Sequence, residues 1–188
     1  MLHILGLLAL TIQSPDTTVI FDAGVRSPAF STTGRLAFAL NGDPWIADVP
    51  EDISSGLVLS AGSLRRVTDG PAWDRAPAWT PDGSALVFSS DRSGTFDIWR
   101  VAVGGLGSRD VPERLTESAE PEGAPVVGPD GAVAFVRGRN ATANIWLIAG
   151  DGTTRQITTG DGAAFSPTFS PSGDSLAYVG REGRSNRL

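Results

Sequence analysis

The chain has 188 residues, of which 40% are hydrophobic and 19% charged, and this is enough apolar material to exclude a wholly disordered chain. Its formal net charge of −6 argues against nucleic-acid binding, because phosphate contacts need clustered cations. There is no Cys, the only His is His3 and all fifteen basic residues are Arg, so disulfides, thiolate metal sites, Lys nucleophiles and the usual Ser/His/Asp relay cannot be assembled from this chain alone.

The first segment is an apolar run, Ile4–Ile12, followed by Gln13 and Ser14. It is too short for a membrane span, which takes about 20 apolar residues. It has the length of the apolar part of a secretory signal, although no Lys or Arg precedes it and no clear cleavage site follows. We therefore expect a signal peptide over residues 1–14 and a periplasmic or secreted protein without a membrane span, with a buried N-terminal strand as the alternative.

A unit of about 45 residues follows and recurs four times. Each copy begins with a Pro, an apolar or aromatic residue and a turn that contains Gly, and continues with a short apolar strand. The four copies of this first element are Pro28–Gly34, Pro77–Gly83, Pro125–Gly131 and Pro167–Gly173. An Ile/Trp strand and a closing Arg-Val-Thr-like strand complete the first three copies, and no apolar stripe at helical spacing interrupts them.

Four short strands per repeat are typical of a propeller blade. The sequence thus predicts an all-β fold, a β-propeller of four-stranded antiparallel blades that is incomplete here, with three full blades and the start of a fourth. The predicted blades cover about 25–68, 74–116, 122–158 and 164–188. Within them, strands are expected near Ala85–Ser89, Asp97–Val101, Ala132–Val136 and Asn144–Ile148. Residues Thr17–Asp22 have the character of an outer strand that could close the ring in a complete propeller.

The second copy carries the string Ser90-Asp91-Arg92-Ser93-Gly94-Thr95-Phe96-Asp97-Ile98-Trp99 after Pro81-Asp82-Gly83. This pattern, repeated in phase, resembles the WD40-like PD40 repeat of TolB-type propellers over roughly Val25–Gly183. The resemblance implies an exported, usually six-bladed propeller that acts as a binding scaffold or stands beside a hydrolase domain.

Three functions follow from the residues and the resemblance. The first is a non-catalytic scaffold for a protein or peptide in an extracytoplasmic compartment. The second is the N-terminal propeller of a larger peptidase or hydrolase, prolyl oligopeptidase-like or tricorn-like, whose catalytic domain lies beyond Leu188. The third is a propeller glycosidase. We expect no enzyme activity on this chain, no cofactor and no metal, and we read the sequence as a piece of a longer product because open blade edges are normally avoided.

Strand alternation places the Pro-Asp-Gly turns at one end of the blades and loops of varied length at the other, where binding usually resides. Trp73, Asp74 and Arg75 form the densest group there, and Trp73 lies outside the repeat phase. Arg26, Arg75 and Glu122 are predicted to share one repeat position facing the central channel. These five residues are the candidate partner site, against the alternative that they are solvated loop charges pairing with one another.

Two further patterns concern carboxylates. Asp74 and Glu122 could serve as a glycosidase pair only if they faced one cleft. Asp91 and Asp97 fall in the hairpin between the second and third strands, and we expect them to bond backbone amides within that turn rather than to act in catalysis.

Overall fold

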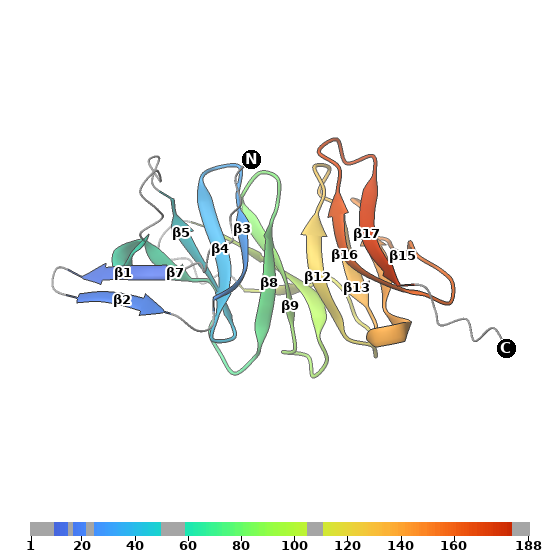
Figure 1. Cartoon of the computed structure of the whole chain (residues 1–188), viewed down its shortest axis with the longest axis horizontal. Coiled ribbons are helices and arrows are strands. Elements are labelled where there is room, and N and C mark those ends of the chain that lie inside the picture. The colour runs from blue at the N-terminus through green and yellow to red at the C-terminus, as the bar shows by residue number, and fades with distance from the viewer. Residues whose placement is uncertain (1–9, 15–16, 22–24, 50–58, 105–110, 182–188) are drawn as a thin grey trace.

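The structure is a computed structural model that describes residues 10–14, 17–21, 25–49, 59–104 and 111–181. Its strands form three four-stranded antiparallel sheets and one two-stranded sheet, which follow one another in chain order across Figure 1. The first is made of β3 (Arg26–Phe30), β4 (Arg35–Leu40), β5 (Asp43–Asp48) and β7 (Leu64–Arg66). The fold is thus a partial β-propeller, and we call its sheets blades one to four.

The other blades repeat the same order. Blade two consists of β8 (Asp74–Trp79), β9 (Ala85–Ser90), β10 (Asp97–Ala102) and β11 (Glu113–Arg114). Blade three consists of β12 (Glu122–Val127), β13 (Val133–Arg137), β14 (Asn144–Ile148) and β15 (Thr154–Gln156). Blade four holds β16 (Ala163–Phe169) and β17 (Leu176–Arg181). The four strands predicted in blades two and three are confirmed to within one residue at each end.

A separate three-stranded sheet stands before the blades. β2 (Thr17–Phe21) pairs antiparallel with β1 (Leu10–Ser14), and β1 pairs in parallel with β6 (Leu59–Ser60), which lies between β5 and β7 in the chain. The strand expected at Thr17–Asp22 is therefore present up to Phe21, but among the described residues its partner is β1 and not a blade. The signal peptide stays a prediction, since most of it lies outside the described residues.

The core lies between the blades. The second strand of each full blade is mostly buried, and its side chains alternate between the two faces of the blade, so that one set packs toward the next blade. One cluster joins Ala37 and Ile46 of blade one to Trp79 and Phe88 of blade two. Two similar clusters join blades two and three and blades three and four. The aromatic and β-branched residues of the repeat thus form the interblade core that the sequence predicts.

Tight turns join the first and second strands. In the blade-two turn the Asp82 carboxylate accepts hydrogen bonds from the Thr80 hydroxyl at 2.6 Å and the Ser84 amide at 3.0 Å. Gly83 takes a φ of +67°, which only glycine adopts readily. The turn is held by its own residues, as the Pro-Asp-Gly sequence predicts.

Helix contributes little to the described residues, where it is limited to two single 3-10 turns, η1 (Ala61–Ser63) and η2 (Asn140–Thr142). None of the described helices is long and apolar enough to cross a membrane.

Candidate functional site at the channel end of the blades

Every first strand begins with the same backbone distortion. The residue before the repeat Pro has a positive φ of about 50° although it is not glycine, and the pairing with the second strand shifts there. The residues concerned are Ser27, Ala76, Ala124 and Ser166. This left-handed position costs energy for a residue with a Cβ, so its recurrence marks a feature that the blade requires. Because it recurs once per blade, this residue also shows which residues of the four blades correspond to one another.

The alignment corrects one prediction. One place before the left-handed residue stand Arg26, Arg75, Gly123 and Phe165. One place earlier stand Val25, Asp74, Glu122 and Ala164. Glu122 is therefore the counterpart of Asp74 and not of Arg26 and Arg75. The polar residues alone do not reveal this correspondence, because the bulge that marks it is a feature of the backbone pairing.

Hydrogen bonds between blades confirm the corrected alignment. The amide of Asp74 donates to the Gly42 carbonyl and that of Glu122 to the Phe96 carbonyl, each at 2.7 Å. The amide of Ala164 donates to the Ala143 carbonyl at 2.8 Å. In each case the acceptor is the residue just before the third strand of the preceding blade, so one repeated contact joins successive blades.

The two carboxylates at this position are buried. Asp74 is 1% exposed, and its Oδ2 accepts hydrogen bonds from the Thr68 hydroxyl and from Arg92 Nη2, each at 2.6 Å. The second oxygen, Oδ1, has no partner in the described part of the chain. Asp74 is thus held by blades one and two together.

Glu122 repeats the arrangement one blade later. It is 1% exposed, its Oε1 accepts from Arg137 Nε at 2.7 Å and its Oε2 accepts from the Thr116 hydroxyl. Burial raises the pKa of Glu122, against the hydrogen bonds from Thr116 and Arg137, which lower it. At the fourth blade the position is Ala164, and Thr158 bonds the Asn144 side chain at 3.0 Å instead. These carboxylates are structural anchors between blades.

Trp73 and Arg26 behave differently from the anchors. The Trp73 side chain is 57% exposed and lies beside the β4–β5 turn, where a Cβ built on Gly42 would be 3.4 Å from its ring. Its amide donates to Asp91 Oδ1 at 2.7 Å. Arg26 is exposed at the start of β3. Neither residue lines the cavity described next.

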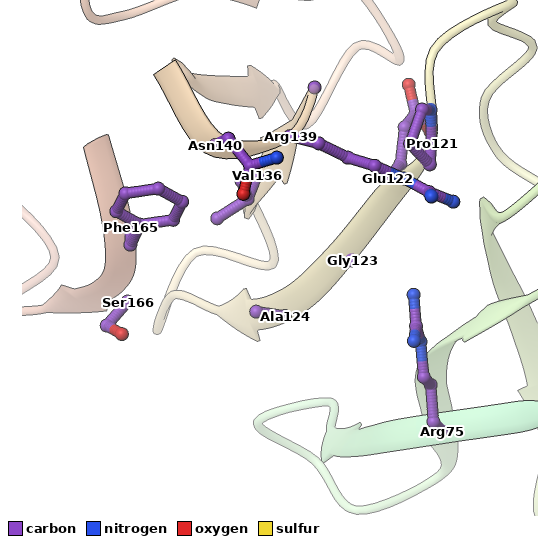
Figure 2. Close-up of a pocket in the computed structure, with 11 residues that line it drawn as sticks. Arg75, Pro121, Glu122, Gly123, Ala124, Val136, Arg139, Asn140, Phe165 and Ser166 are labelled. Carbon is purple, nitrogen blue, oxygen red and sulfur yellow. The ribbon is translucent and has the colours of Figure 1, made fainter. Parts of the chain in front are cut away.

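A cavity of about 440 Å³ opens where blades two, three and four meet, at the end of the blades opposite the tight turns between first and second strands. We call this the channel end. Its wall is built from the last two positions before the repeat Pro, represented by Arg75, Gly123, Ala124, Phe165 and Ser166. The end of β13, the β13–β14 loop and the residues where β12 begins supply the rest, namely Pro121, Glu122, Val136, Gly138, Arg139 and Asn140. Figure 2 shows these residues around the ribbon of β12.

Two arginines reach this cavity from opposite sides. Arg75 extends from β8 and Arg139 from the loop after β13, toward each other beside β12 (Figure 2). The Arg75 guanidinium stacks on the Phe96 ring, 3.6 Å from its centroid. Partial burial first, and the Arg139 charge second, lower the pKa of Arg75, while Asp91 opposes them. The site can thus present two cations to a ligand, of which Arg75 is held in place by its stack on Phe96.

The two hairpin carboxylates bond farther away than predicted. Asp91 accepts from the Trp73 amide in the preceding loop, and Asp97 accepts from the Ser118 amide at 3.2 Å and from Arg114 at 2.8 Å. Their structural character agrees with the prediction, but the amides they hold belong to neighbouring loops and not to the hairpin itself. Sequence proximity made the local partner the obvious choice, and the folding of the loops over the hairpin replaced it.

The sequence-based candidate site included Arg75 and Glu122 of the cavity and missed its other members. Gly123, Ala124, Phe165 and Ser166 could have been found by aligning the blades on the repeat Pro. Arg139 stands at the position that Arg92 holds in the β9–β10 loop, where Arg92 pairs with Asp74, so the repeat gives no signal that Arg139 lines a cavity. In the residues that the structure describes, no three His, Cys, Asp or Glu side chains gather in a way that could hold a metal ion.

Comparison with known proteins places the fold. The chain is 33% identical over 147 residues to an uncharacterised protein of Agrobacterium fabrum, a match that covers 71% of this chain and 48% of the other. It is 30% identical over 125 residues to the TolB homologue of Chlorobium luteolum, covering 64% of this chain and 27% of the other. The crystal structure of TolB from Acinetobacter baumannii matches with a TM-score of 0.60 and 29% identity, covering 90% of this chain and 42% of that one.

The chain thus spans about half the length, or less, of the curated relatives it matches. Enzymes share the fold as well: an oligogalacturonate lyase matches with a TM-score of 0.65 at 17% identity, over 90% of this chain and 50% of that one. At that identity the likeness concerns the fold alone. No protein-family model matches the sequence, so the assignment of its repeats to the PD40 family stays a resemblance.

The repeated blade, the interblade core and the TolB relatives agree with one another in sequence and in structure. The chain is therefore similar in sequence and in fold to TolB-type β-propellers.

Proposed function

We propose that this chain is a non-catalytic scaffold that binds a protein or peptide in an extracytoplasmic compartment, at the channel end of its blades. The observation that carries the proposal is a cavity to which three successive blades contribute the same repeat position, occupied by Arg75, Gly123 and Phe165. Such a site has walls of rigid strands and a rim of irregular loop, the combination from which binding sites are commonly made.

Relatives support the class of function. A protein of Bordetella pertussis that is 39% identical over 56 residues, 28% of this chain and 13% of that one, is named a Tol-Pal system protein TolB. Membership of a multi-protein system agrees with a propeller whose work is to bind another protein. The proposed extracytoplasmic location rests on the apolar leader and on the resemblance to exported propellers. An alkaline phosphatase fusion after Leu188 tests it, since that reporter is active only outside the cytoplasm.

The second candidate is a propeller that belongs to a larger hydrolase. It is favoured by the share of the relatives' length that the chain leaves uncovered. This chain has no Cys or Lys and a single His at residue 3, so the catalytic groups would belong to a part beyond Leu188. Reading the gene downstream of Leu188 separates the two candidates.

The glycosidase candidate gains no support from the geometry. Asp74 and Glu122 occupy the same place in successive blades, and each is buried with an Arg and a Thr on its oxygens. A glycosidase pair needs two carboxyl groups that flank a sugar in one cleft.

Site-specific photo-cross-linking tests the binding proposal. Phe165 lines the cavity, and p-benzoyl-phenylalanine replaces it with a side chain of similar shape. The control carries the same cross-linker at Thr154, exposed on the outer strand β15. Irradiation of producing cells should join a second protein or a peptide to position 165 and not to position 154, as seen by gel shift and mass spectrometry. No adduct at 165, or the same adducts at both positions, would contradict the proposal.

A further inference from the structure

The structure assigns a recognition role to Arg75 and Arg139. We infer that together they bind a carboxylate of the peptide or protein partner, so that the cavity selects acidic ligands. This inference rests on the proposed function and adds the chemical class of the ligand to it.

The first argument is geometric. Arg75 belongs to blade two and Arg139 to blade three, and both guanidinium groups enter the cavity beside Gly123 (Figure 2). Gly123 has no side chain at the position where the neighbouring blades carry Arg75 and Phe165, so it leaves the space between them open. A Cβ placed on Gly123 would lie 3.9 Å from Arg75 Nη2, which shows how directly that guanidinium faces the gap.

The second argument concerns charge. Arg66, Arg92, Arg114 and Arg137 each form an ion pair with a carboxylate. Among the described residues no carboxylate lies within ion-pair distance of Arg75 or Arg139. Two carboxylates are nearby: Glu122, whose oxygens are taken by Arg137 and Thr116, and Asp91, which attracts Arg75 and bonds the Trp73 amide. The cavity therefore keeps an excess of positive charge in a chain whose net charge is −6.

The third argument is that the pair is held for a ligand and not for the fold. Both arginines keep much of their surface exposed, although Arg75 is partly buried against Phe96, so neither carries the interblade packing. The stack on Phe96 orients the Arg75 guanidinium before a ligand arrives, which lowers the entropy lost on binding. A carboxylate between two guanidinium groups accepts several charge-assisted hydrogen bonds and relieves their mutual repulsion.

The remaining walls fit a peptide. The Phe165 ring and Val136 are apolar, while Asn140 and Ser166 offer an amide and a hydroxyl. A volume of about 440 Å³ accommodates one or two amino-acid side chains, at the lower end of the range for ligand sites. The carboxylate could belong to an Asp or Glu side chain or to a C-terminus, and the two sources share the same chemistry.

Four peptide libraries test the inference on the full chain. Each is a heptapeptide library labelled with fluorescein at its N-terminus, with Asp or Glu at the centre in two of them and Asn or Gln in the other two. One library of each kind is amidated at its C-terminus and one is free. Fluorescence anisotropy then gives the affinity of each library for the wild type and for Arg75→Gln, Arg139→Gln, the double variant and the matched control Arg155→Gln. Arg155 is an exposed arginine of β15, away from the cavity.

We expect at least one kind of carboxylate-bearing library to bind at least about 10-fold more tightly than the amidated neutral library, and each arginine variant to lose about 10-fold of that affinity, because hydrogen bonds to charged groups are the strong ones. Arg155→Gln should bind like the wild type. Selectivity for a central acid in amidated peptides identifies a side-chain carboxylate, and selectivity for free C-termini identifies a terminal one. Circular dichroism of every variant confirms that the blades remain folded.

A cavity-filling variant, Gly123→Phe, separates the two levels of the proposal. One outcome overturns the carboxylate inference and leaves the binding site standing. In it the libraries bind without regard to charge, the arginine variants bind like Arg155→Gln, and Gly123→Phe abolishes binding. If no library binds, or Gly123→Phe binds them like the wild type, the proposed site and the inference both fail.

Discussion

Carboxylates at the two ends of the blades have pKa values shifted in opposite directions. At the turn end, Asp82 is exposed, and hydrogen bonds from the hydroxyl of Thr80 and from Ser84 lower its pKa to about 2. Asp174, in the corresponding turn of blade four, has its pKa lowered by the hydroxyls of Ser172 and Ser170. At the channel end, Glu122 is buried and its pKa is raised.

The difference follows from where the partners come from. The donors to Asp82 lie within two residues of it, so the turn satisfies the carboxylate without help from the rest of the fold. The donors to Glu122 lie 6 and 15 residues away, and its backbone amide is held by the preceding blade. The turn end is built locally, whereas the channel end is built by the packing of one blade on the next.

The largest expected effect tests this contrast by removing the buried anchor. Glu122→Ala leaves Arg137 without its ion-pair partner and should lower the free energy of unfolding by about 3–5 kcal/mol, the usual cost of breaking a buried pair. Asp82→Ala is the matched change at the turn end and should cost much less, since water replaces the lost hydrogen bonds. Urea denaturation followed by circular dichroism measures both. Equal losses would show that the channel end is not the more tightly coupled of the two.

A smaller effect concerns pH. Because the pKa of Glu122 is raised in the folded state, the folded chain binds more protons than the unfolded chain above the ordinary Glu value of 4.5. Stability should therefore fall as pH rises from 4.5 through the raised pKa, and Glu122→Gln should reduce this fall. The lowered pKa of Asp82 acts in the opposite sense, so its contribution is lost as pH falls from 3.8 toward 2.

Melting temperatures measured from pH 2 to pH 8 give both limbs of this profile. Asp82→Asn is the control, because it should weaken the acid limb and leave the limb above pH 4.5 as it is in the wild type. A Glu122→Gln profile that parallels the wild type above pH 4.5 would count against burial as the dominant influence on Glu122.

The smallest expected effect compares one glycine from each end. Gly131, in the blade-three turn, has a φ of +84° and open space around its Cα, so Gly131→Ala meets only backbone strain and should cost about 1 kcal/mol. Gly123 at the channel end has no positive φ, and an added Cβ would make only ordinary contacts, the nearest at 3.7 Å to Ser89 Oγ. Gly123→Ala should leave the melting temperature within about 2 °C of the wild type. A larger loss at Gly123 than at Gly131 would reverse the comparison.

Much of the fold could be predicted because the same pattern of turn residues and apolar strands recurs four times in the sequence. The Pro-Asp-Gly turns, the buried strand Ala85–Ser90 and the Ile-Trp strand after it each follow from short-range chemistry: turn residues, alternation and apolar runs. The partner of Thr17–Phe21 was not predictable in this way, because strand pairing depends on which edges meet in space.

Some features of the candidate site follow from the local sequence, and others depend on contacts between distant residues. Trp73 falls outside the repeat phase, which makes a place in the blade core less expected, and the residue is 57% exposed. The burial of Asp74 and Glu122 was missed, since nothing in the sequence around an acidic residue says that an arginine 15 or 18 residues away will reach it. For the same reason, the sequence does not show that Arg75 and Arg139 line one cavity.

By itself, the sequence determined the blade, its turns and its apolar strands, because each of these depends on residues that are neighbours in the chain. The tertiary structure decided which side chains line the cavity, which carboxylates are buried and which arginines remain without an ion-pair partner among the described residues. Those outcomes depend on how one blade packs against the next. The left-handed residue in each first strand shows that Glu122 corresponds to Asp74, whereas the residue pattern alone groups Glu122 with Arg75, one position later in the strand.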